Sequence, residues 1–190
     1  MKTIRFAAAA LMVGLLATVA TAFEGDDVAP DFKATTPDGK EVSLDTVKAA
    51  EVVVVVFTCN QCPVAVAYED RFIDFNKKYK DKNVAFVAIN NSTAEDVEAM
   101  KQRIEEKGLN YVYAYDGSGE SAKSYGAKST PTCYVLDKNR KVVYHGAFDD
   151  VWNGEPEKHY VSSVVDSLLK GEAPQYTETK AVGCAIKLKR

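Results

Sequence analysis

The residues best suited to chemistry are Cys59 and Cys62, which are separated by two polar residues. They follow an apolar, β-branched run over residues 52–57 and precede a segment with helical periodicity, so they are expected between a buried strand and a helix. A helix N-terminus presents free N–H groups and a positive dipole end, which stabilise a thiolate, the reactive form of cysteine. Pro63 is compatible with a first helical turn. We therefore expect a redox-active dithiol, with Cys59 as the exposed nucleophile of lowered pKa and Cys62 as its shielded resolving partner.

Other uses of the cysteine pair remain open on the sequence alone. A structural disulfide is compatible with the spacing. A zinc knuckle would need a second pair, whereas Cys133 and Cys184 are isolated, and a c-type haem site would need a histidine at the position of Pro63. A copper site formed by Cys59, Cys62 and His145 stays open. We expect no cofactor and no metal site, and we expect Cys133 to be a small core residue.

Length and composition indicate one ordinary globular domain. The chain has 190 residues, is 46% hydrophobic and carries a formal charge of −3. These values allow a substantial core without disulfide staples. Neither a basic patch nor an aromatic-interleaved basic stretch is present, so nucleic acid is not an expected partner.

The first 22 residues have the features of a signal peptide. Lys2 and Arg5 precede an apolar run over residues 6–19, and Ala20-Thr21-Ala22 matches a signal-peptidase site. The apolar run is short for a transmembrane span, so stable membrane insertion is not expected after cleavage. The sequence thus predicts a signal peptide over residues 1–22 and a protein that is exported to a periplasm or secreted.

The remaining pattern predicts an α/β fold, a central mixed β-sheet flanked by helices. Pro37-Asp38-Gly39 favours a turn between two short strands, an N-terminal β-hairpin extension. Residues 52–57 and 84–89 read as buried parallel strands joined by a helix. A second helix is expected to begin with a capping box, Ser92-Thr93-Ala94-Glu95, and to stop at Gly108. The expected domain covers residues 23–172, with a C-terminal tail over 173–190. The other expected elements are a strand near 111–115, a helix near 120–125, strands at 132–136 and 141–145, and a helix after Pro156.

The cysteine pair, followed later by Thr130-Pro131 before a strand, resembles the thioredoxin-like superfamily. In that superfamily the Thr-Pro bond is cis, faces the cysteine pair and leaves the preceding backbone free to pair with an extended substrate segment. The resemblance implies that Thr130 and Pro131 bind substrate. Thioredoxins also bury an aspartate where this chain has Val53, so the proton-handling acid is absent or comes from elsewhere. Glu69 is a weak candidate.

Within the superfamily, the chain resembles the redoxin/AhpC-TSA branch, and in particular peroxiredoxin-like proteins that carry a thioredoxin-type cysteine pair. The residues that carry this resemblance are Val28-Ala29-Pro30-Asp31-Phe32, Asn60-Gln61-Cys62-Pro63, Ala67-Tyr68-Glu69-Asp70-Arg71 and Val182-Gly183-Cys184-Ala185-Ile186-Lys187. It places Cys62 at the peroxidatic position and makes Cys184 a candidate resolving thiol. Cys59 stands where true peroxiredoxins have threonine or serine, and residues 126–136 lack their arginine, which argues against ordinary peroxidase chemistry.

The expected function is therefore exchange of disulfides with protein or small-molecule thiols through Cys59 and Cys62. A reductive role would need an electron donor borne by the membrane. One alternative is a thiol-dependent peroxidase with Cys62 as the attacking thiol. Another is a copper-binding or redox-inert domain.

Overall fold

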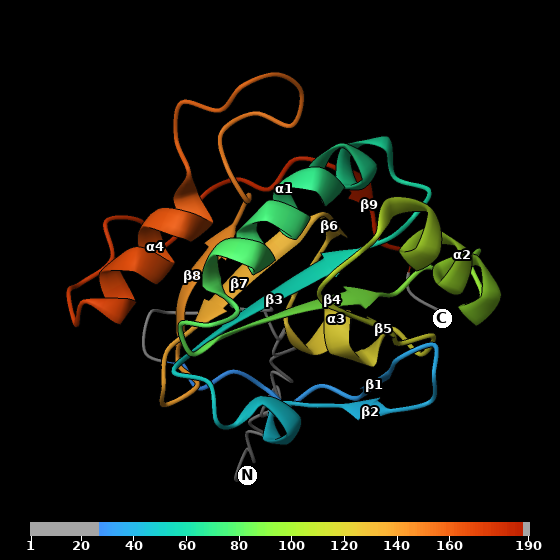
Figure 1. Cartoon of the computed structure of the whole chain (residues 1–190), viewed down its shortest axis with the longest axis horizontal. Helices are drawn as coiled ribbons and strands as arrows, with labels where there is room; N and C mark the ends of the chain where they lie inside the picture. The colour runs from blue at the N-terminus through green and yellow to red at the C-terminus, as the bar shows by residue number, and fades with distance from the viewer. Residues whose placement is uncertain (1–26, 188–190) are drawn as a thin grey trace, which may run out of the picture.

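The computed structural model describes residues 27–187, so the predicted signal peptide over residues 1–22 lies outside the described residues. The described chain forms a seven-stranded mixed sheet in the order β2-β1-β5-β4-β3-β7-β8, with helices packed against it (Figure 1). The predicted α/β class is confirmed. The strands of this sheet are β1 (Ala34–Thr35), β2 (Glu41–Val42), β3 (Val52–Thr58), β4 (Val84–Asn90), β5 (Val112–Tyr115), β7 (Thr132–Leu136) and β8 (Val142–Gly146).

Strand β3 lies at the centre of the fold, and all seven of its residues are buried. It pairs in parallel with β4 and antiparallel with β7. Because successive side chains point to opposite faces of a sheet, Val54 and Val56 enter one hydrophobic core and Val53 and Val55 enter the other. This burial on both faces explains the continuous apolar run seen in the sequence.

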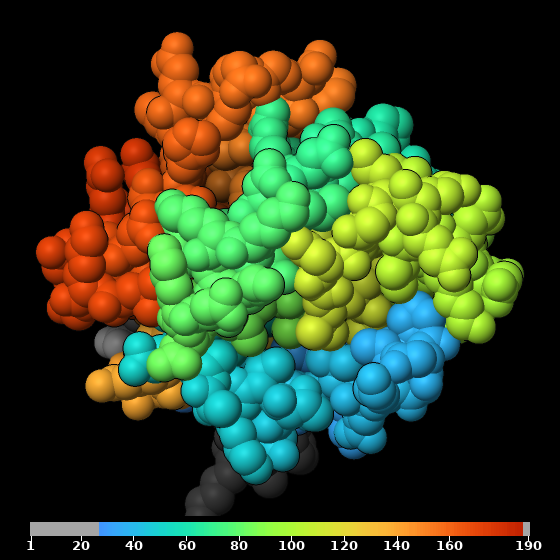
Figure 2. All heavy atoms as spheres, viewed as in Figure 1, coloured from blue at the N-terminus to red at the C-terminus, as the bar shows by residue number. Residues whose placement is uncertain are grey.

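The helices divide between the two faces of the sheet. Helices α1 (Pro63–Tyr79), α2 (Val97–Lys107) and α4 (Tyr160–Leu169) contribute to one core, and residues of α3 (Glu120–Ser124) contribute to the other. A short 3-10 helix, η1 (Asp45–Val47), follows the hairpin. Figure 2 shows α1 and α2 side by side on the surface of one face, where they cover the sheet.

The predicted N-terminal hairpin is confirmed. Ala34 of β1 pairs with Val42 of β2, and Thr35 pairs with Tyr115 of β5, so the hairpin widens the main sheet. Gly39 has φ +87° at the turn, a conformation that glycine adopts without steric cost.

The predicted start of the second helix is wrong by about one turn. Helix α2 begins at Val97, and its N-cap is Asp96, whose carboxylate accepts a hydrogen bond of 2.8 Å from the N–H of Ala99. Glu95 therefore lies before the helix, and its carboxylate bonds elsewhere. The end of the helix at Gly108, in the left-handed conformation, agrees with the prediction.

The C-terminal tail packs against the domain, although its sequence has little periodicity. Its residues Cys184–Ala185 form β9, which pairs with β6 (Ser129–Thr130) in a separate two-stranded ladder. An aperiodic sequence cannot reveal this pairing, because two residues are too few to show alternation.

Candidate active site

The two cysteines occupy the predicted junction between strand and helix. Cys59 directly follows β3, and Cys62 is the N-cap of α1 in an extended conformation, with Pro63 as the first helical residue. Cys62 is buried, at 2% exposure, whereas Cys59 is partly exposed. This difference in exposure agrees with the expectation from the sequence.

Both sulfur atoms converge on Thr130. A hydrogen bond of 3.5 Å links Cys59 Sγ with Thr130 Oγ1, and Cys62 Sγ donates a hydrogen bond of 3.1 Å to the Thr130 carbonyl oxygen. The Thr130–Pro131 peptide bond is cis, as the resemblance implies. The structure therefore brings together the cysteine pair and the Thr-Pro segment, which are separated by about 70 positions in the chain.

The acidities of the two thiols are the reverse of the expected order. Burial raises the pKa of Cys59 above its ordinary value, and the negative charge of Glu95 adds to this rise. Burial also opposes ionisation of Cys62, but hydrogen bonds from the Cys184 thiol and the Ala65 N–H outweigh it, so the pKa of Cys62 is lowered. The prediction of a lowered pKa for Cys59 was wrong, because the strand–helix junction partly buries this thiol and a carboxylate lies near it.

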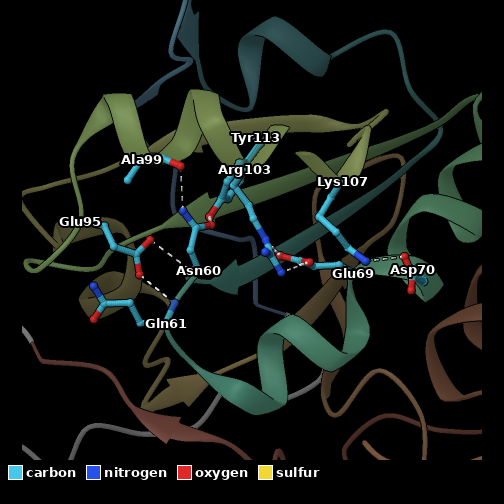
Figure 3. A network of polar contacts seen from close by, with 9 residues as sticks. All are labelled: Asn60, Gln61, Glu69, Asp70, Glu95, Ala99, Arg103, Lys107 and Tyr113. Atoms are coloured by element: carbon cyan, nitrogen blue, oxygen red, sulfur yellow. Dashed lines mark hydrogen bonds and ion pairs between the residues drawn. The ribbon is translucent and has the colours of Figure 1, made fainter. Parts of the chain in front are cut away.

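That carboxylate belongs to Glu95, a site residue that the sequence pattern did not indicate. Its two oxygen atoms accept hydrogen bonds of 3.0 Å from the backbone N–H groups of Asn60 and Gln61, the residues between the cysteines (Figure 3). Asn90 Nδ2 donates a further bond of 2.7 Å to Glu95. Glu95 is only 7% exposed, so its charge acts from inside the protein. The capping-box pattern drew attention to Glu95, but assigned its carboxylate to the wrong partner.

The loop between the cysteines is also held through the side chain of Asn60. Its Oδ1 accepts a hydrogen bond of 2.7 Å from the Tyr113 hydroxyl, and its Nδ2 donates to the carbonyl oxygen of Ala99 (Figure 3). The backbone N–H groups of Asn60 and Gln61 thus bind Glu95, and the side chain of Asn60 binds α2 and β5. The cysteine pair is therefore presented on a fixed support.

Glu69, the acid considered from the sequence, is engaged away from the cysteines. Arg103 donates hydrogen bonds to both of its carboxylate oxygens, of 2.8 Å from Nε and 2.5 Å from Nη2 (Figure 3). Glu69 is 5% exposed, so the ion pair joins α1 to α2 inside the protein. Its contacts are those of a structural residue.

A pocket of about 220 Å³ opens beside the cysteine pair. It is bordered by Cys59, Cys62, Thr130 and Cys184, together with residues 91–94 and 185–187. The candidate resolving thiol therefore lies at the same pocket as the pair. Among the residues that border it, Lys187 is the cation. The described arginines bind elsewhere: Arg71 to Asp149, Arg103 to Glu69, and Arg140 to backbone carbonyls of residues 47–50.

The remaining chemistry-bearing residues lie apart from this pocket. Cys133 is completely buried in the core on β7, and burial raises its pKa strongly. His145 lies on β8 with its ring stacked on Tyr134, the ring centroids 6.0 Å apart. Over residues 27–187, no group of three or more histidine, cysteine or acidic side chains is arranged to hold a metal ion. In the same range, no helix is both long and apolar enough to cross a membrane.

Comparison with known proteins places these features in a family. The family model described as Redoxin matches residues 23–163. The thiol-disulfide oxidoreductase ResA of Bacillus thuringiensis is 30% identical over 117 residues, which are 60% of this chain and 65% of that protein. A chloroplastic peroxiredoxin Q of Suaeda salsa is 29% identical over 161 residues, 80% of this chain and 68% of that protein. The match thus spans slightly less than two thirds of ResA.

Solved structures agree with this assignment. An uncharacterised conserved protein from Geobacillus kaustophilus is 35% identical and superposes with a TM-score of 0.82, over 88% of this chain and 93% of that one. A Chlorobium tepidum protein described as a thiol:disulfide interchange protein DsbE, 25% identical, superposes with a TM-score of 0.59 over 64% of this chain and 84% of that one. A thioredoxin-family protein from the same organism, 20% identical, has a TM-score of 0.62 over 78% of this chain and 99% of that one. The chain belongs to the redoxin family and has a thioredoxin-like fold.

Proposed function

We propose that this protein is an exported thiol–disulfide oxidoreductase whose redox couple is Cys59 and Cys62. The observation that carries the proposal is the convergence of both sulfur atoms on Thr130, with one thiol partly exposed and the other buried at a shared pocket. A disulfide-exchange site needs one thiol that a substrate can reach and a second thiol held close to it. The ResA-like relatives support the same reaction class.

The proposed reaction has two steps. Cys59 loses its proton and attacks a substrate disulfide; one substrate sulfur leaves as a thiolate and the other forms a mixed disulfide with Cys59. Cys62 then attacks Cys59 Sγ, which releases the second substrate thiol and leaves the Cys59–Cys62 disulfide. The lowered pKa of Cys62 favours this second step, because it increases the fraction of Cys62 present as the attacking thiolate. Run in reverse, the same steps introduce a disulfide into a dithiol substrate.

The geometry defines the substrates by chemical class: they are disulfides of proteins or small molecules that reach Cys59. Export is supported by the sequence of residues 1–22. If the protein acts as a reductant outside the cytoplasm, its dithiol must be regenerated after each reaction. We therefore include a membrane-borne electron donor as its partner in that case.

Two assays run side by side test the proposal. Reduced protein should reduce the interchain disulfides of insulin with dithiothreitol as the terminal donor, and Cys59→Ser should abolish the reaction. The same preparation should consume hydrogen peroxide slowly. Failure of the wild-type protein to accelerate insulin reduction above dithiothreitol alone would overturn the proposal.

A second candidate, thiol-dependent peroxidase, is favoured by one observation: Cys62 is the thiol with the lowered pKa, and it borders a pocket large enough for peroxide. Its thiolate would attack one peroxide oxygen, form a sulfenic acid and release hydroxide. Cys59 or Cys184 would then displace water to form a disulfide. The 29% identical peroxiredoxin Q supports this class. Peroxide reduction at about 10⁴ M⁻¹s⁻¹ or faster, the lower end of ordinary enzyme efficiency, would make it the main function.

A further inference from the structure

We propose that Cys184 is a third redox-active thiol of this site and forms with Cys62 a disulfide that exchanges with the Cys59–Cys62 disulfide. The inference rests on the proposed function and extends it from two thiols to three. It is carried by the way in which the C-terminal tail is fixed against β8 and β6, and by the position of Cys184 opposite Thr130, whose carbonyl oxygen Cys62 Sγ contacts.

The tail is first fixed along the edge of β8. The N–H of His145 donates a 3.0 Å hydrogen bond to the Thr177 carbonyl, and the N–H of Thr179 returns one of 3.1 Å to the His145 carbonyl. The Thr179 hydroxyl oxygen also accepts a bond of 3.0 Å from the N–H of Ala147. At Gly146, whose φ is +142°, a Cβ atom would overlap the backbone of Thr179. Glycine at this position therefore permits the close approach of the tail.

The tail is fixed a second time beside the cysteines. In the β6–β9 ladder, Cys184 pairs with Thr130 and Ala185 pairs with Ser129. The N–H of Ile186 donates a 2.9 Å hydrogen bond to the Lys128 carbonyl. A Cβ atom on Gly183 would overlap the Thr130 carbonyl oxygen, so this glycine also permits the approach. Cys184 is thus held at a defined register opposite the residue that both other cysteines contact.

Cys184 and Cys62 meet at the same residue and pocket. Both border the pocket, and Cys62 Sγ donates its 3.1 Å hydrogen bond to the carbonyl oxygen of Thr130, the residue opposite Cys184 in the ladder. Interaction between the two thiols lowers the pKa of Cys62 and raises the pKa of Cys184 to about 11. The tail lies against the Thr130 carbonyl oxygen, which is the atom that Cys62 Sγ contacts, whereas Cys59 Sγ contacts the Thr130 hydroxyl. The geometry therefore pairs Cys184 with Cys62 rather than with Cys59.

The position of the tail also bears on substrate binding. The resemblance to thioredoxins assigns the backbone before Pro131 to an extended substrate segment, and β9 occupies that backbone edge here. An external protein segment must therefore displace β9 before it can pair with Thr130.

The exchange is balanced within the chain. The Cys184 thiol loses its proton and its thiolate attacks Cys62 Sγ of the Cys59–Cys62 disulfide. The Cys62–Cys184 bond forms, the Cys59–Cys62 bond breaks, and the electron pair leaves on Cys59 Sγ, which takes up a proton. No net oxidation occurs, so the step requires no additional oxidant or reductant. The product carries a free Cys59 thiol at the pocket.

The test maps disulfides in full-length single variants. Reduced Cys59→Ser and Cys62→Ser proteins are oxidised with one equivalent of diamide, which takes two electrons and two protons from a pair of thiols. Monomer is isolated, digested with trypsin without reduction and analysed by mass spectrometry. In Cys59→Ser, the peptide of residues 49–71 should be linked to that of residues 181–187. In Cys62→Ser, this link should be about tenfold less abundant, because Cys184 is positioned against Cys62.

A tail variant tests the geometric basis without altering a thiol. Adding Gly183→Ala to Cys59→Ser should reduce the linked peptide by about tenfold, because the added Cβ displaces the tail from Thr130 and lowers the effective thiol concentration. Val182→Ala is the matched control, since its side chain is 53% exposed, and it should preserve the link. A link that survives Gly183→Ala undiminished would overturn the assignment to the docked tail.

The wild-type protein separates failure of this inference from failure of the proposed function. If wild type closes Cys59–Cys62 and reduces insulin, but Cys59→Ser gives no linked peptide, the three-thiol exchange is wrong and the two-thiol function stands. Equal links in the two single variants would also overturn the pairing with Cys62. If Cys59→Ser gives the link but wild type does not reduce insulin, the proposed oxidoreductase function is wrong.

Discussion

Thr130 pairs with Cys184 across the β6–β9 ladder, and the same residue contacts both sulfur atoms of the cysteine pair. One backbone position therefore gathers three thiols, two from the first third of the chain and one from near its end. Thr130 is 4% exposed, so water does not compete for these contacts. The arrangement predicts which thiol attacks the substrate, how its alkylation depends on pH and which nearby acid has a structural role.

The first prediction concerns the division of labour between the two thiols. Cys62→Ser should accumulate mixed disulfides with substrate, because the partly exposed Cys59 can attack but its resolving partner is missing. Cys59→Ser should accumulate none with protein substrates, because Cys62 is buried. Both variants are alkylated after incubation with substrate and examined on non-reducing gels. Adducts that form only in Cys59→Ser would identify Cys62 as the attacking thiol.

The second prediction concerns the Glu95 carboxylate and pH. Burial, together with the Glu95 charge, raises the pKa of Cys59, so Cys59 stays protonated at neutral pH and its alkylation should accelerate as pH rises through that pKa. Glu95→Gln removes the negative charge, so the pKa of Cys59 should fall and the alkylation profile should move to lower pH. The rate of iodoacetamide labelling at Cys59, followed by mass spectrometry across pH, gives the pKa of Cys59 in the wild-type protein and in Glu95→Gln.

Glu98→Gln is the matched control for this experiment, because Glu98 lies on α2 with a side chain that is 81% exposed. Its Cys59 profile should coincide with that of wild type. A Glu95→Gln profile that stays in place, or moves to higher pH, would show that Glu95 does not tune the thiol.

The third prediction tests whether Glu69 stabilises the fold rather than taking part in the chemistry at the cysteine pair. Arg103→Ala leaves Glu69 buried without its partner, which should lower the free energy of unfolding by about 3 kcal/mol, as for other buried pairs. Lys101→Ala breaks an exposed pair with Glu98 and should cost less than about 0.5 kcal/mol. Urea unfolding measures the free energy of unfolding of both variants. If Arg103→Ala moves the Cys59 alkylation profile while leaving stability unchanged, Glu69 has a role at the site instead.

The fourth prediction concerns export. The positive residues, apolar run and Ala20-Thr21-Ala22 of the first 22 residues predict cleavage after Ala22. N-terminal sequencing of the protein recovered from outside the cytoplasm should therefore begin at Phe23. Recovery of full-length protein that starts at Met1 would contradict the predicted signal peptide.

The sequence predicted those parts of the fold that depend on local pattern. The apolar run of β3, the turn at Gly39 and the helix end at Gly108 each have a signal within a few residues, and each lies where it was expected. The placement of the cysteine pair at a helix N-terminus was also predicted from local pattern. Such features follow from steric and hydrophobic preferences that act along the chain.

The sequence could not predict features that depend on burial or on contacts between distant segments. The pKa of Cys59 is raised because the folded chain buries it and brings Glu95 to the same loop, 36 residues away in sequence. The helix dipole favoured the opposite sign, and burial outweighed it. The pairing of Cys184 with Thr130 likewise has no local signal, apart from a glycine at position 183 whose purpose emerges only in the fold.

A redox titration of the wild-type protein tests the central claim most directly. The protein is equilibrated in glutathione buffers of graded ratio, acid-quenched, alkylated and mapped by mass spectrometry. The account predicts one reversible two-electron transition in which Cys62 loses its reactivity and Cys59 loses it to the extent that the Cys59–Cys62 disulfide is populated over the Cys62–Cys184 disulfide. Cys133 is protected throughout by its complete burial. If Cys59 and Cys62 both remain free thiols across the whole range, or close irreversibly, they are not an exchanging redox couple and the account is wrong.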